Sequence, residues 1–117
     1  MKGDAGYALQ KLELAILLLA TGQGDVRSRL NTAYIAELHI LREEDFPEPL
    51  RLQWIWIKRK LTSAPPLRDE NGSVTVGSLH RTLKKMRNST GSEIARRIIV
   101  LRDTLGGYFS DLARSCN

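Results

Sequence analysis

The sequence has little of what most enzymes and metalloproteins use. Among its 117 residues there is one cysteine, Cys116, and there are two histidines, His39 and His80. A single cysteine excludes a disulfide within the chain and gives no support to an oxidising compartment. With only two histidines, the chain has few side chains that can both donate and accept protons near neutral pH. We therefore predict a non-enzymatic, cytoplasmic protein with no catalytic residues, no cofactor and no metal site.

Long apolar runs are also absent. The longest, residues 14–20, is far shorter than the roughly 20 residues that a membrane-spanning helix needs. The N-terminal region carries Asp4, and Glu13 interrupts the apolar residues behind it, which is not the pattern of a signal peptide. The sequence thus predicts neither a membrane span nor a signal peptide.

The composition that remains is that of an ordinary globular protein. Apolar residues make up 42% of the chain and charged residues 26%, which excludes an intrinsically disordered chain. A chain of this length buries roughly two thirds of its unfolded surface, enough for a core without disulfides. We expect one domain over residues 1–117, with an exposed loop at 62–75 and frayed termini at 1–5 and 113–117.

Apolar residues recur every three or four positions in several stretches, a spacing typical of helices with one buried face. The stretches cover residues 7–20, 26–41, 50–61, 79–86 and 91–112. The fold class that we predict is an all-α, single-domain bundle of about five helices.

The first and the last of these helices are expected to form the centre of the core. In the first, Leu14, Leu17 and Leu18 widen the apolar sector until it nearly encircles the segment, which predicts a central, mostly buried helix. The last has a stripe of apolar residues, begins with a capping-box pattern at residues 90–93, and meets two glycines at 106–107 that predict its end or a kink. The residues of the stripe are Ile94, Ile98, Leu101 and Leu105.

The third segment has two interpretations. Leu50, Trp54, Ile57 and Leu61 fall within a narrow arc at helical spacing, whereas Leu50, Leu52, Trp54 and Trp56 alternate as in a strand. We favour the helix. The alternative is an α+β fold with a short hairpin formed around residues 50–60 and 73–77, since an isolated strand at 73–77 has no other expected partner.

Charge is distributed unevenly along the chain. Residues 1–50 have a net charge of −3, and residues 51–117 have a net charge of +8. Between Leu79 and Arg102, seven basic residues are opposed only by Glu93. An anionic partner would be attracted to such a surface, unless the acidic half covers it within the chain or in a neighbouring subunit.

The two tryptophans are the other notable feature. If their segment is helical, Trp54 and Trp56 lie about 200° apart around the helix, so both do not face one core. One of them is therefore expected to meet a partner, unless the helix is sandwiched between two layers. The candidate partner-binding residues are Trp54, Trp56, Arg81, Lys84, Lys85, Arg87, Arg96, Arg97 and Arg102.

Two functional hypotheses follow. The first is a small non-enzymatic interaction module that acts through a protein partner or through self-association. The second is a nucleic-acid-binding protein that uses the basic C-terminal helices for phosphate contacts, without a recognisable motif for reading base sequence. Neither hypothesis involves a membrane.

Overall fold

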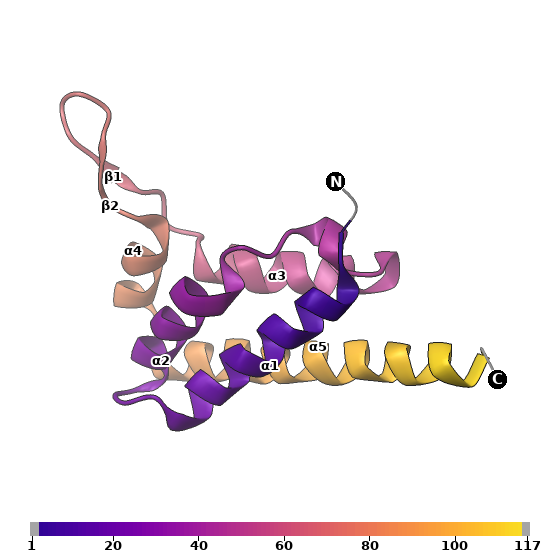
Figure 1. The fold of residues 1–117 in the computed structure, drawn as a ribbon. Coiled ribbons are helices and arrows are strands. Elements are labelled where there is room, and N and C mark those ends of the chain that lie inside the picture. Colours follow the sequence, from indigo (N-terminus) through magenta and orange to yellow (C-terminus); the bar gives the residue numbers. More distant parts are fainter. Residues whose placement is uncertain (1–2, 116–117) are drawn as a thin grey trace.

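The computed structural model describes residues 3–115, and the predicted all-α bundle is confirmed (Figure 1). Cys116 and the ends of the two termini that were predicted to fray, residues 1–2 and 116–117, lie outside the described part. The five α-helices of residues 3–115 are α1 (Ala5–Thr21), α2 (Val26–Ala33), α3 (Arg51–Leu61), α4 (Ser78–Lys85) and α5 (Asn88–Ser115).

The core is built on the apolar stripe of α5. Ile94, Ile98, Leu101 and Leu105 are all fully buried, as their helical spacing predicts. Helices α1, α2 and α3 each pack against α5. Burying one such side chain contributes about 1.5–3 kcal/mol, so this single stripe is a large part of what holds the bundle together.

Helix α1 lies at the surface, and the expectation of a central, mostly buried helix was wrong. Its inward face is small and apolar, with Ala8, Leu12 and Ala15 fully buried. Leu14 and Leu17 point outward, and Leu17 is 56% exposed. The reason is geometric: α1 packs against α2 and α5 on one side, and no element within residues 3–115 covers the other.

Three turns connect α2 to α3. After Ala33 the helix widens into a π-helical turn at Tyr34–Leu38, and 3-10 turns follow at Glu43–Asp45 and Glu48–Leu50. The second of these three turns holds a buried carboxylate, that of Asp45. It accepts hydrogen bonds from the backbone N–H groups of Asp4 (3.1 Å) and Arg42 (2.9 Å), so it fastens the start of α1 to this connection.

Helix α3 confirms the helical interpretation of the tryptophan segment. Trp54 is 1% exposed and stacks on Phe46 with 5.5 Å between ring centroids. Ile57 and Leu61 are buried on the same face, whereas Leu52 is 78% exposed. The strand alternative for residues 50–60 is therefore wrong, because the buried residues follow the helical spacing and not the alternation.

A hairpin is nevertheless present, in the region predicted as an exposed loop. Strand β1 (Leu67–Arg68) pairs antiparallel with β2 (Val74–Val76), so the strand at 73–77 has a different partner from the one expected. The Asp69 carboxylate closes the turn by accepting from the backbone N–H groups of Asn71 and Ser73. Gly72 has a φ of 82°, a conformation that glycine adopts without strain. The hairpin projects away from the helices (Figure 1).

Helix α5 is longer than its sequence signals predict. It begins at Asn88, so the residues of the predicted capping box lie inside the helix. It also continues through the glycines at 106–107 to Ser115, and its C-terminal part extends beyond the other helices (Figure 1). Tyr108 and Leu112 are exposed there, at 38% and 44%. The predicted ending of the helix at the glycines was wrong.

The fold makes a matched prediction for two apolar residues. Ile98→Ala should lower the free energy of unfolding by about 2–5 kcal/mol, because the truncation leaves a cavity beside three helices. Leu17→Ala should lower it by less than about 1 kcal/mol, because the side chain faces solvent. Urea denaturation of both variants measures the difference, and equal losses would contradict the placement of α1.

Candidate anion-binding site

Three contacts hold α4 in place: two to the segment that follows α3, and one to α2. The Thr82 hydroxyl, which is buried, accepts from the backbone N–H of Ala64 (2.9 Å) and donates to the carbonyl of Ser78 (2.7 Å). The Arg81 guanidinium donates to the carbonyl of Pro65. The bond between Thr82 and Ser78 lies within α4, whereas the bonds to Ala64 and Pro65 hold α4 against the segment that follows α3. The basic end of α4 therefore lies near the basic end of α3.

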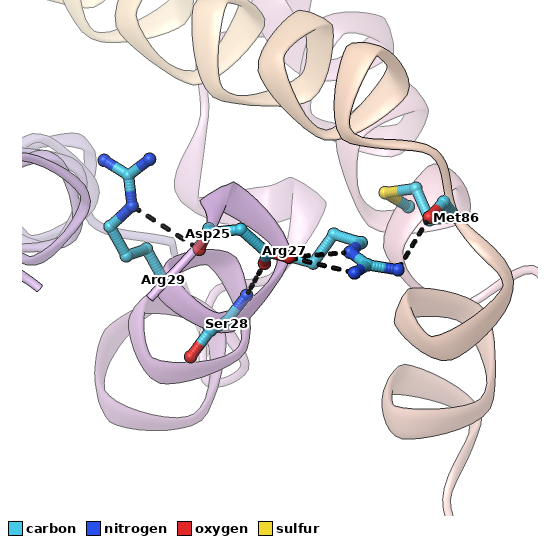
Figure 2. A network of polar contacts seen from close by, with 5 residues as sticks. All are labelled: Asp25, Arg27, Ser28, Arg29 and Met86. Carbon is cyan, nitrogen blue, oxygen red and sulfur yellow. Dashed lines mark hydrogen bonds and ion pairs between the residues drawn. The ribbon is translucent and has the colours of Figure 1, made fainter. Parts of the chain in front are cut away.

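The third contact holds the C-terminal end of α4 against α2. Figure 2 shows Arg27 reaching across to Met86, whose carbonyl accepts from the guanidinium at 3.1 Å. The Asp25 carboxylate orients Arg27 by accepting two more of its hydrogen bonds, at 2.9 and 3.2 Å. Asp25 also caps α2 by accepting from the backbone N–H of Ser28. The hydrogen bonds from Arg27 and Ser28 lower the pKa of the Asp25 carboxyl below its ordinary value.

A pocket of about 470 Å³ opens where α3, α4 and the start of α5 meet. We call it the basic pocket. Three of its residues are cationic and come from three parts of the chain: Lys60 from α3, Lys85 from α4, and Arg87 from the turn before α5. The remaining lining residues are Ser63, Thr82, Met86 and Thr90.

No acidic residue lines the basic pocket. Within residues 3–115, no salt bridge joins Lys60, Lys85 or Arg87 to a carboxylate. Three uncompensated cations in one concave site produce a positive potential that attracts anions. The site is therefore suited to bind a phosphate or carboxylate group.

The structure separates the basic residues predicted from the sequence into two groups. Arg96 and Arg97 both bond to Glu93, and these bonds lower the pKa of the Glu93 carboxyl. Arg102 pairs with Asp103 at 2.8 Å and with Glu13 of the acidic half at 3.8 Å. These three arginines are already compensated and do not join the basic pocket.

The other predicted cations lie on α4 or in the turn directly after it. Lys85 and Arg87 line the basic pocket, whereas Arg81 and Lys84 line a second pocket, which lies between α4 and the hairpin and also includes Lys85. The basic residues singled out in the sequence thus converge only in part: α4 and the turn after it take part, and the middle of α5 does not.

The two tryptophans have different environments. Trp54 is in the core, whereas Trp56 is half-buried between two cations. The Nζ atom of Lys60 lies 5.5 Å from the centroid of the Trp56 ring, and the Cζ atom of Arg97 lies 5.1 Å from it. Both contacts are within cation–π distance. The less buried tryptophan therefore adjoins the basic pocket through Lys60.

Lys60 is the site residue that the sequence analysis missed. A signal was present, because Lys60 ends a run of three basic residues, 58–60, at the C-terminus of α3. Such a run also complements the dipole of its own helix, which explains it without any ligand. Only the packing of α3 against α4 shows that one of these cations meets Lys85 and Arg87.

Comparison of the chain with known protein families, with curated proteins and with solved structures finds no match. In the part of the chain that the structure describes, no group of three or more His, Cys, Asp and Glu residues is placed to hold a metal ion. Nor does any helix of that part have the length and apolarity to cross a bilayer. The function is therefore argued from the chemistry of the basic pocket.

The environments of the tryptophans predict their response to quenchers. In Trp54→Phe, the remaining Trp56 should be quenched by iodide more strongly than by caesium, because the uncompensated cation of Lys60 lies beside its ring. In Trp56→Phe, the remaining Trp54 should resist both ions because it is buried. Fluorescence quenching of the two variants tests this, and equal quenching of both by iodide would contradict it.

The lowered pKa of Asp25 predicts how stability depends on pH. A carboxyl whose pKa is lower in the folded than in the unfolded chain stabilises the fold above its unfolded pKa, about 3.9, and this contribution is lost as pH falls through the folded value. Asp25→Asn should therefore lower the melting temperature at neutral pH, and the difference from wild type should shrink below about pH 4.

Glu70→Gln is the matched control, because Glu70 lies exposed at the hairpin turn. Its melting temperature should follow that of the wild type across the pH range. A difference between Asp25→Asn and wild type that stays constant down to low pH would show that the Asp25 charge does not stabilise the fold.

Proposed function

We propose that the protein is a non-enzymatic nucleic-acid-binding module that contacts phosphate groups through the basic pocket and the surface around it. The observation that carries the proposal is the convergence of Lys60, Lys85 and Arg87 without an acidic neighbour. Lys and Arg contacts to phosphates supply most of the affinity of non-specific nucleic-acid binding. No cofactor is needed for such binding.

The extent of the positive surface supports a strand-like partner. From the basic pocket it continues along α4, where Lys85 also lines the second pocket together with Arg81 and Lys84. That second pocket has a volume of about 440 Å³ and ends at Leu67 and Val76 of the hairpin. Two adjoining basic pockets suit a chain of phosphates better than a single small anion.

The positions of the tryptophans favour nucleic acid over the protein-interaction surface that the sequence analysis placed first. That expectation places one of the two tryptophans at the surface, beside parts of the basic half. Trp54 is in the core, and the less buried Trp56 is flanked by Lys60 and Arg97. A surface of cations around an aromatic ring suits an anionic partner with bases or sugars beside its phosphates. An acidic protein partner is the alternative that the experiment must separate.

The proposal predicts a steep dependence of binding on salt. Fluorescence anisotropy should detect binding of single-stranded and duplex DNA or RNA at low salt and micromolar protein. On duplex DNA, the affinity should fall between about 50 and 200 mM salt with a slope of about 0.9 for each phosphate contact. The triple variant Lys60→Glu, Lys85→Glu, Arg87→Glu should bind more weakly and show a flatter slope.

The control reverses the same number of charges at arginines that already have acidic partners. Arg96→Glu, Arg102→Glu, Arg114→Glu should retain most of the affinity and the slope, because these side chains form ion pairs on α5. No binding of any nucleic acid by the wild type would contradict the proposal. Equal binding of polyglutamate at matched charge would assign the surface to acidic proteins instead.

A further inference from the structure

We propose that the basic pocket binds a terminal phosphate monoester, the group found at a phosphorylated end of a nucleic-acid strand. The inference rests on the proposed function and adds a defined ligand for one part of the surface. Such an end group differs in charge from the rest of the strand. A phosphate monoester carries a charge of about −1.5 to −2 at neutral pH, whereas each phosphodiester within a strand carries a charge of −1.

The charges of the pocket match the more highly charged group. Lys60, Lys85 and Arg87 face one volume, and none of them has a carboxylate partner among the described residues. The polar pocket between α2 and α4 provides the contrast. It is lined by Arg27, Lys84 and His80, but Asp25 also lines it and would repel a phosphate. The second pocket has three cations and no acid, as the basic pocket has, but its Arg81 already donates to the carbonyl of Pro65.

The side chains of the basic pocket also supply suitable hydrogen-bond geometry. Arg87 presents a planar fork of N–H donors that can contact two phosphate oxygens, and the two lysines add compact charges. Ser63 and Thr90 are exposed at the pocket and carry hydroxyl groups able to donate to the remaining oxygens. Thr82 is different, because its hydroxyl is already used between Ala64 and Ser78. The buried Thr82 side chain is thus fixed by its hydrogen bonds, whereas Ser63 and Thr90 are exposed to a ligand.

The size of the pocket fits an end group with its sugar. A volume of about 470 Å³ is well above that of a phosphate alone, and the pocket is widely open to solvent. A strand whose end is bound there can therefore continue over α4 along Lys84 and Arg81. The two pockets would therefore bind successive parts of one partner.

The test compares single-stranded oligonucleotides of one sequence with a 5′-phosphate, a 3′-phosphate or hydroxyl groups at both ends. Anisotropy should show at least one phosphorylated form binding about ten-fold more tightly than the hydroxyl form, the effect expected of one charge-assisted contact. Arg87→Ala should abolish this preference, and Arg87→Lys should retain part of it. Arg96→Ala is the control and should leave the preference unchanged.

The outcomes separate this inference from the proposed function. Equal binding of all three oligonucleotides would overturn the terminal-phosphate site and leave general phosphate binding intact. No binding of any of them would overturn both. A nucleoside monophosphate that binds in a titration followed by NMR, without any preference among the oligonucleotides, would assign the pocket to free nucleotides and overturn its role with strand ends.

Discussion

Burial of one apolar stripe along α5 is the interaction on which the rest of the structure depends. Ile94, Ile98 and Leu101 are the surface against which α1, α2 and α3 are placed, so a change in the register of α5 would move all three helices. The start of α5 is held especially close to α2. A Cβ atom added at Gly91 would lie 2.8 Å from Val26 Cγ1, so a larger residue there would push the two helices apart. This contact also fixes the direction in which the chain enters α5, directly after Arg87.

The basic pocket depends on this arrangement indirectly, because the pocket is lined by residues of α3, α4 and the start of α5. Helix α4 has eight residues, and a helix of this length is not stable in isolation. It is held by the hydrogen bond between Ala64 and Thr82 and by the contact from Arg27 to Met86. These bonds place cations of α3 and α4 around one pocket that has no acidic residue in its lining. A bound anion would neutralise these cations, and this is the physical reason to interpret the pocket as a binding site.

Helical spacing made much of the fold predictable from the sequence. The site was less predictable, because it depends on contacts between side chains that are far apart in the sequence. The stripe of α5 and the buried face of α3 follow directly from sequence spacing. Leu17 does not, because the sequence of α1 is apolar on nearly all sides and only the packing decides which side is covered. The partner of β2 was missed because β1 has only two residues. Among the cations, the pairing of Arg96 and Arg97 with Glu93 follows from helical spacing. The pairing of Arg102 with Glu13 joins distant parts of the chain, so sequence spacing does not predict it. The same is true of the pocket that Lys60 and Lys85 share.

If Lys60 and Lys85 belong to one anion-binding site, a bound anion should protect both from modification. Lysine acetylation followed by mass spectrometry measures this protection, with the rate at each lysine determined with and without a 5′-phosphorylated oligonucleotide. Lys58 is an internal reference, because it lies on α3 beside Glu43 and outside the basic pocket. The oligonucleotide should slow acetylation of Lys60 and Lys85 together and leave the rate at Lys58 unchanged. Equal rates at all three lysines with and without the oligonucleotide would contradict it.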